Sequence, residues 1–228
     1  FSKGAASEAL KEYALRGLVT VKKTKPLVLE ALISDWAKRG VQSPKEELII
    51  ASEKDDVFEL NRLSQLERRA AGVLGENCVR TAKHCFYTGD RVLITKNSRK
   101  LGVKNGKLGT VRRISPIFKK ITVVLDSGRI VSINLTDFPH IALGYAITTH
   151  KAQGISTDNA FVLAGGSMQD RELTYVQSSR AKKPTRFYLS ETDAGEELSG
   201  ISRQMAKSRK KEMAHTLLDP ELKTSISF

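Results

Sequence analysis

The sequence has no apolar run of about eighteen residues or more, so nothing in it predicts a membrane-spanning helix. Its first residues, Phe1 to Gly4, lack the basic, apolar, small-residue order of a secretory signal peptide. It has only two cysteines, and neither belongs to a Cys-x-x-Cys pair with histidines at zinc spacing. We therefore expect a cytoplasmic protein with no membrane partner, no metal site and two plain thiols.

Acidic residues are in the minority: 25 aspartates and glutamates stand against 38 lysines and arginines, a formal net charge of +13. Residues 89–120 concentrate the imbalance, with ten lysines and arginines and a single acid, Asp90. Such a balance favours a polyanionic partner, because lysine and arginine release condensed counterions when they bind phosphates. A solvated basic surface is the alternative interpretation.

Apolar periodicity indicates two kinds of structure. Residues 47–52 form a short apolar run typical of a strand buried in a parallel sheet, and residues 54–71 then follow helical spacing. After His140 the same alternation predicts helix 145–153, strand 160–163, helix 170–181 and strand 186–189. Residues 90–134 instead alternate with period two between Asn-Gly and Asp-Ser-Gly turns, which predicts a small antiparallel barrel.

We therefore expect an α/β fold in which a small antiparallel β-barrel interrupts a parallel-sheet domain. The predicted division assigns residues 41–89 and 140–192 to the α/β domain and residues 90–139 to the insertion. Residues 1–40, two helical stretches around an extended piece, are expected to be the helical end of a preceding lobe or a linker. Residues 193–228 are expected to form a basic tail, helical or disordered.

Two strings carry the functional argument: Thr148-Thr149-His150-Lys151-Ala152-Gln153-Gly154 and Tyr175-Val176-Gln177-Ser178-Ser179-Arg180-Ala181. They resemble motifs V and VI of superfamily 1 DNA helicases of the RecD type, including the helicase region of TraA- and TrwC-type conjugative relaxases. The stretch 89–111 resembles the SH3-like insertion, domain 2B, in the second RecA-like domain, 2A, of these enzymes. Asp56-Val57 and Leu60-Asn61 resemble the surroundings of motif IV.

The resemblance implies a P-loop-NTPase-type motor domain that faces a nucleotide held by another lobe. Arg180 is then the candidate arginine finger, because a guanidinium is always charged and can bridge two phosphate oxygens. Gln153 and Gly154 are expected to lie toward the nucleotide. The alternative for Arg180 is a contact at the end of its own helix, where the helix dipole favours a cation.

Single-stranded DNA is the partner that the resemblance implies for motif V. The expected DNA-binding residues are Thr148, Thr149, His150 and Lys151 in motif V, with Asn97 and Lys104 in the insertion. Phe118 is the only aromatic residue between Asp90 and Asn134, so the barrel is expected to contact phosphates rather than stack on bases.

Two elements of such an enzyme are missing from the sequence. It has no Gly-x-x-x-x-Gly-Lys-Ser/Thr loop and no Asp-Glu strand for magnesium. Residues 102–108 have glycines at shorter spacing and end in leucine, which cannot ligate Mg²⁺. ATP and Mg²⁺ are therefore expected as cofactors of the parent protein. The Mg²⁺ ligands are expected on an upstream RecA-like lobe of the same polypeptide, and this piece is expected to be inactive alone.

Relaxase nuclease chemistry is not expected, because the four histidines are scattered along the sequence. Two other functions compete with an ATP-dependent DNA helicase. A non-enzymatic nucleic-acid-binding module would explain the basic barrel, and an RNA-associated barrel protein would leave the two motif strings unexplained.

Overall fold

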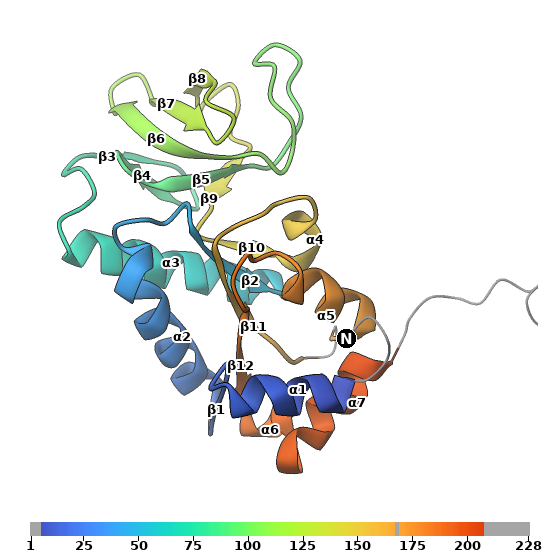
Figure 1. Ribbon diagram of the computed structural model, residues 1–228. Coiled ribbons are helices and arrows are strands. Elements are labelled where there is room, and N and C mark those ends of the chain that lie inside the picture. The colour runs from blue at the N-terminus through green and yellow to red at the C-terminus, as the bar shows by residue number, and fades with distance from the viewer. Residues whose placement is uncertain (1–5, 167–168, 208–228) are drawn as a thin grey trace, which may run out of the picture.

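A computed structural model of the chain describes residues 6–166 and 169–207. Five parallel strands form one sheet in the order β1-β12-β11-β2-β10 (Figure 1). Their bounds are β1 Val19–Lys22, β2 Glu47–Ala51, β10 Ala146–Thr148, β11 Asn159–Leu163 and β12 Arg186–Ser190. The expected α/β fold with a parallel sheet is confirmed.

Helices cover both faces of this sheet. On one face, α2 (Lys25–Gly40) and α3 (Lys54–Ala70) share a core with Ile49 of β2. On the other, α1 (Ala6–Leu15) and α7 (Ser199–Ala206) share a core with Ile50. Because successive side chains of β2 enter different cores, the strand is apolar throughout its middle, as its short apolar run predicts.

A second, antiparallel sheet has the order β8-β7-β6-β5-β9. Its strands are β5 Arg91–Ile94, β6 Leu108–Ser115, β7 Lys120–Leu125, β8 Ile130–Asn134 and β9 Ile141–Leu143. Alternate residues of β7 and β8 are buried, which agrees with the period of two. Gly109 is required where β6 meets β7, because a Cβ there would lie 2.6 Å from the Val123 Cγ1 atom.

The amino-terminal segment does not behave as a linker or as part of another lobe. Strand β1 pairs in parallel with β12, with Val19 opposite Phe187, and Trp36 of α2 is fully buried in the core. The expectation for residues 1–40 is therefore wrong for the described part, residues 6–40. Local periodicity predicted the helices, but the pairing of β1 depends on a strand far away in the sequence.

The predicted helix 145–153 is only partly a helix. Residues Ala146–Thr148 form β10 beside β2, and only Thr149–Ala152 form a helix, α4. Tertiary pairing with Ile49–Ala51 overrides the local helical spacing.

The carboxyl-terminal segment begins as ordered helices. Helix α6 (Glu191–Ala194) and a short 3₁₀ helix (Glu196–Leu198) lead into α7, whose Ile201 and Met205 are fully buried. The expected tail is thus helical and packed through Ala206, while its residues 208–228 lie outside the described ones.

A two-stranded ribbon, absent from the sequence prediction, joins α3 to the antiparallel sheet. It consists of β3 (Cys78–Arg80) and β4 (Cys85–Tyr87), and Phe86 anchors it in the core. Cys78 and Cys85 are free thiols that face each other across it, with 3.0 Å between their Sγ atoms. The ribbon holds the intervening tip, residues 81–84, in a fixed place.

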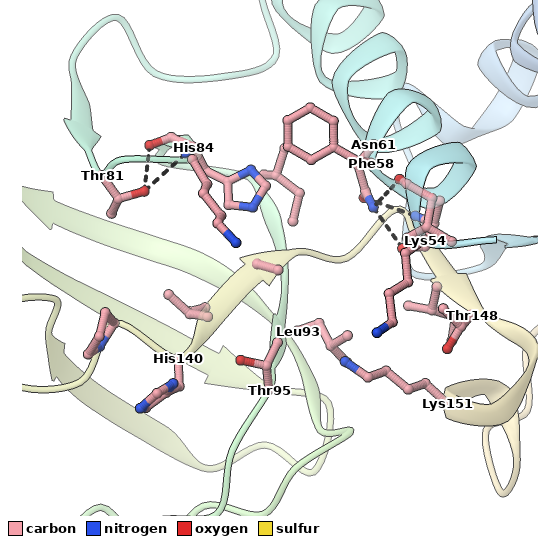
Figure 2. A pocket seen from close by; sticks show the side chains of 18 of the residues that line it. Lys54, Phe58, Asn61, Thr81, His84, Leu93, Thr95, His140, Thr148 and Lys151 are labelled. Atoms are coloured by element: carbon pink, nitrogen blue, oxygen red, sulfur yellow. Dashed lines mark hydrogen bonds between the residues drawn. The ribbon is translucent and has the colours of Figure 1, made fainter.

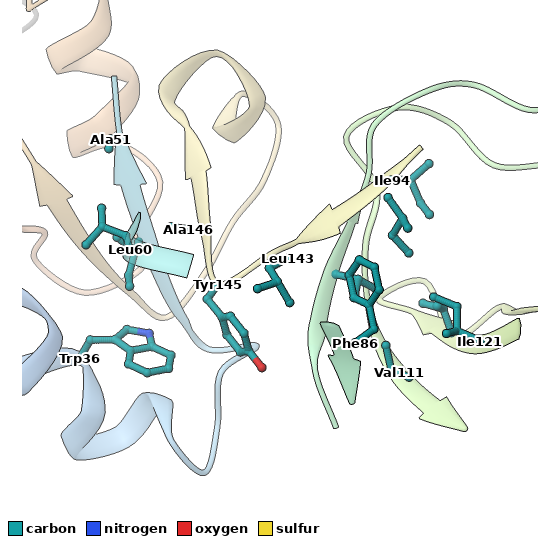
Figure 3. Close-up of a cluster of buried hydrophobic side chains, with 14 of the residues drawn as sticks. Trp36, Ala51, Leu60, Phe86, Ile94, Val111, Ile121, Leu143, Tyr145 and Ala146 are labelled. Atoms are coloured by element: carbon teal, nitrogen blue, oxygen red, sulfur yellow. The ribbon is translucent and has the colours of Figure 1, made fainter. Parts of the chain in front are cut away.

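The chain passes between the two sheets twice, and buried polar contacts join these crossings. Asp90 lies at the first crossing and Tyr145 at the second. The Tyr145 hydroxyl donates to Asp90 Oδ1 over 2.6 Å. The Tyr87 N–H and the Gln65 amide both donate to Asp90 Oδ2 over 2.7 Å. Tyr145 also packs edge-on against Trp36, with ring centroids 5.9 Å apart (Figure 3). The α/β domain and the barrel are therefore connected through one hydrogen-bonded cluster.

Asp90 predicts a pH dependence of stability. Burial raises the pKa of its carboxyl from 3.8 to about 6, against the opposing effect of the three donors. The folded state therefore binds this proton more tightly than the unfolded state does. As pH rises from about 4 to about 6, the stabilisation that the protonated Asp90 contributes is lost, on the order of 3 kcal/mol of unfolding free energy. We expect the unfolding free energy of the wild type, minus that of Asp90→Asn, to fall over this range in denaturant titrations. A flat difference for Asp90→Asn would contradict the prediction.

Candidate functional site

A pocket of about 550 Å³ opens between the α/β domain and the barrel (Figure 2). Four separate segments form it: the first turns of α3, the tip of the β3–β4 ribbon, the strands β5 and β9, and β10 with α4. The lining residues are Lys54, Val57, Phe58, Asn61, Thr81, Ala82, Lys83, His84, Leu93, Thr95, Pro139, His140, Ile141, Ala142, Leu143, Ala146, Ile147, Thr148 and Lys151. Its size suits a small ligand or a piece of a polymer.

The pocket is basic. Three lysines line it, Lys54, Lys83 and Lys151, and no acidic side chain does. The side chains of Lys54 and Lys151 extend toward one another from α3 and α4 (Figure 2). Burial lowers the pKa of Lys151, and the positive charge of Lys54 lowers it further. A bound anion would relieve this repulsion between like charges.

Motif V is split between the pocket and the core. Thr148 and Lys151 line the pocket, whereas His150 is exposed outside it. Thr149 is 1% exposed; its hydroxyl donates to the Ala51 carbonyl over 3.3 Å and accepts from the Gln177 amide over 3.0 Å. The expectation that the Thr149 side chain faces DNA is therefore wrong, because protein groups already occupy its hydroxyl.

Motif VI lies on α5 (Arg171–Ser178), which begins where Asp170 Oδ1 accepts from the Leu173 N–H over 2.7 Å. Gln177 is fully buried, and its amide connects Thr149 of α4 with Ser52 after β2. The two motif strings thus meet at the carboxyl edge of the parallel sheet.

Arg180 follows the end of α5 and is partly exposed. Its Nε donates to the Val176 carbonyl over 2.9 Å, and its Nη2 donates to the Ser179 hydroxyl over 2.8 Å. No carboxylate pairs with it among residues 6–166 and 169–207. The contact at the end of its own helix is therefore present, but it leaves the guanidinium partly exposed and without a carboxylate partner among the described residues.

The other predicted residues lie outside the pocket. Gln153 and Gly154 follow α4 and are exposed, and Gly154 has a φ of +78°, which favours glycine. Asn97 and Lys104 are exposed on the long loop between β5 and β6, where Asn97 Oδ1 accepts from the Asn105 N–H over 2.8 Å. The structure therefore does not bring Asn97 and Lys104 together with Thr148 and Lys151.

Sequence reasoning missed Lys54, Phe58 and His84 as site residues. Lys54 and Phe58 are one helical turn apart on α3, a spacing that the sequence displays but that also fits any solvated helix face. Nothing local to His84 indicates that it approaches Phe58. Only the folded ribbon places these two rings at one wall.

Among the described residues there is no helix long and apolar enough to cross a membrane. Within the same ranges, no group of three or more histidine, cysteine, aspartate or glutamate residues is arranged to hold a metal ion.

Comparison with known proteins finds no matching family model. The chain is 34% identical over 193 residues to the conjugal transfer protein TraA of Agrobacterium fabrum, covering 82% of this chain and 17% of that protein. It is 31% identical over 226 residues to the TraA of Rhizobium radiobacter, covering 96% of this chain and 20% of that protein. It is also 33% identical over 147 residues to the ATP-dependent RecD2 DNA helicase of Deinococcus radiodurans, covering 63% and 19%.

The chain thus spans about a fifth of the length of these relatives. Among solved structures, a Pif1 helicase from Bacteroides in complex with ADP-AlF3 and single-stranded DNA aligns at a TM-score of 0.49 and 23% identity, over 71% of this chain and 44% of that one.

Proposed function

We propose, since the chain belongs to the superfamily 1 helicase region of TraA-type conjugative relaxases, that it is the second motor domain of an ATP-dependent DNA helicase. In this proposal the pocket face binds single-stranded DNA, and Arg180 reaches ATP held by an N-terminal lobe. The observation that carries the proposal is a pocket with three lysines and no acid, contacted by one motif string and connected by Thr149 and Gln177 to the other.

The charge of the pocket supports a phosphate polymer as its ligand. Lys54 and Lys151 approach one another without an acid between them, an arrangement that is unfavourable unless an anion is bound. Helix α4 has only four residues, so its dipole adds little, and the lysine side chains carry the attraction. Binding should therefore be strongly dependent on salt.

The nucleotide side of the proposal depends on Arg180, Gln153 and Gly154. All three lie beyond the ends of α4 and α5, with exposed or partly exposed side chains and backbone. The guanidinium fits a phosphate group, since it keeps an exposed side and no paired acid among the described residues. ATP with Mg²⁺ would supply the free energy of translocation, and the described residues provide no magnesium ligand cluster.

The alternative is a nucleic-acid-binding module without enzymatic activity. One observation favours it: both hydrogen bonds of Arg180 go to its own helix end, as a purely structural cation would make them. The two proposals predict the same DNA binding and differ only in ATP turnover with a nucleotide-binding lobe.

Binding of a labelled single-stranded oligonucleotide by the 228-residue chain tests the DNA-binding claim. We expect Lys151→Ala to weaken binding several-fold and to reduce the slope of log affinity against log salt by about 1, because one phosphate contact is lost. Lys22→Ala is the matched control, since this exposed lysine lies on β1, at the opposite edge of the sheet from β10. If fluorescence anisotropy shows equal effects of the two substitutions, the pocket is not the DNA site. Robust ATP hydrolysis by the chain alone would count against the need for a second lobe.

A further inference from the structure

We propose that the pocket holds one nucleotide of the strand in a defined orientation, with its base stacked on Phe58 beside His84 and its phosphate between Lys54 and Lys151. This inference rests on the proposed binding of single-stranded DNA and deepens it. The sequence predicted phosphate contact without base stacking for the barrel alone, and Phe58 and His84 lie outside residues 90–139.

The stacking surface is the end of a row of three rings. Phe86 is fully buried in the core, His84 lies 5.6 Å from it, and Phe58 lies 5.6 Å from His84, both measured between ring centroids. Phe58 is 48% exposed and lines the pocket, so its ring is accessible to a ligand that enters there. A base stacked there would bury apolar surface on a rigid support.

His84 acts in this row as an uncharged ring. Burial lowers its pKa, and the neighbouring charge of Lys83 lowers it further, so the ring is neutral at pH 7. Thr81 holds it in place: the Thr81 hydroxyl donates to the His84 carbonyl over 2.9 Å and accepts from the His84 N–H over 3.0 Å. The tip of the ribbon is therefore organised before any ligand binds.

The phosphate position follows from the geometry of α3. Lys54 and Phe58 are four residues apart on that helix, so they lie on one face with about 5–6 Å between their Cβ atoms. Lys151 extends to the same place from the opposite wall (Figure 2). The positions of Lys54 and Phe58 are thus one helical turn apart on α3, and we infer that the two lysines bind the phosphate and the ring stacks on the base of the same nucleotide.

Base identity should matter little. Most of the lining side chains are apolar, and the Asn61 amide and the Thr81 hydroxyl are already bonded to backbone groups. Discrimination between bases needs donors and acceptors aimed at base edges. We therefore infer a pocket that accepts any nucleobase, as translocation along arbitrary sequence requires.

The test compares a base-bearing oligonucleotide with an abasic oligonucleotide of the same length and phosphate number. We expect Phe58→Ala to weaken binding of the base-bearing strand about 5- to 150-fold and to leave binding of the abasic strand unchanged. Phe58→Trp should retain the wild-type preference. Lys54→Ala should weaken binding of both strands equally. Phe118→Ala, which removes a 71% exposed phenylalanine before β7, is the matched control and should change neither.

The outcomes separate this inference from the proposal beneath it. If the wild-type chain binds neither oligonucleotide, the DNA-binding proposal fails and this inference fails with it. If the wild type binds the base-bearing strand and Phe58→Ala binds it equally well, DNA binding stands and base stacking is overturned. If Phe58→Ala loses affinity for the base-bearing and the abasic strand equally, stacking is also overturned, because Phe58 then has a structural role. A shifted melting temperature of the variant would show that role independently.

Discussion

Arg180→Ala, in the chain joined to an ATP-binding lobe, is expected to lower DNA-stimulated ATP turnover about a thousand-fold or more. An arginine finger stabilises charge that develops on the transferred phosphoryl group, and its removal commonly costs this much in kcat. Reaching the nucleotide requires Arg180 to exchange its bonds with the Val176 carbonyl and the Ser179 hydroxyl for phosphate oxygens. Steady-state ATPase assays at saturating DNA measure the effect.

Lys182→Ala is the matched control for Arg180. This lysine is two residues away and exposed, and it pairs with Asp158 over 2.8 Å, a surface contact worth little. It should leave turnover near the wild-type value. Arg180→Lys should not restore turnover, because an ammonium lacks the planar, bidentate geometry with which a guanidinium binds phosphate oxygens. Unchanged turnover in Arg180→Ala, with a small loss of thermal stability alone, would assign the residue to the end of its helix and favour the non-enzymatic alternative.

Asn61→Ala is expected to reduce the unfolding free energy by about 3 kcal/mol. The substitution leaves three buried backbone groups of residues 145 and 146 without a partner, at a cost of about 1 kcal/mol or more for each. β10 is an edge strand, and the Asn61 amide supplies pairing on its open side. Its Nδ2 donates to the Ala146 carbonyl over 2.8 Å, and its Oδ1 accepts from the Tyr145 and Ala146 N–H groups over 2.9 and 3.0 Å. Denaturant titration followed by circular dichroism measures the loss.

Because β10 leads directly into α4, Asn61→Ala should also weaken DNA binding at temperatures where the protein remains folded. Asn105→Ala, an exposed asparagine in the loop between β5 and β6, is the control and should change neither stability nor affinity. A stability of Asn61→Ala equal to that of Asn105→Ala would show that solvent satisfies the edge of β10 without the amide.

Elements with a strong pattern of their own were predictable. Strand β2 is apolar because both its faces are covered, and strands β7 and β8 of the antiparallel sheet alternate because one face is buried. The segment 145–148 was wrongly predicted as a helix because a three-residue strand has too few residues to display a period. Thr149 was wrongly assigned to DNA because the motif string does not show which of its hydroxyls turns inward.

By itself, the sequence determined the α/β class, the antiparallel insertion and the resemblance to superfamily 1 helicases, since each depends on residues that are close together along the chain. The tertiary structure decided that residues 6–40 belong to the parallel sheet, and it built the pocket from α3, the ribbon tip, the barrel and α4. The physical reason is that a binding site depends on distances between side chains from separate segments, and only packing of the whole chain sets those distances.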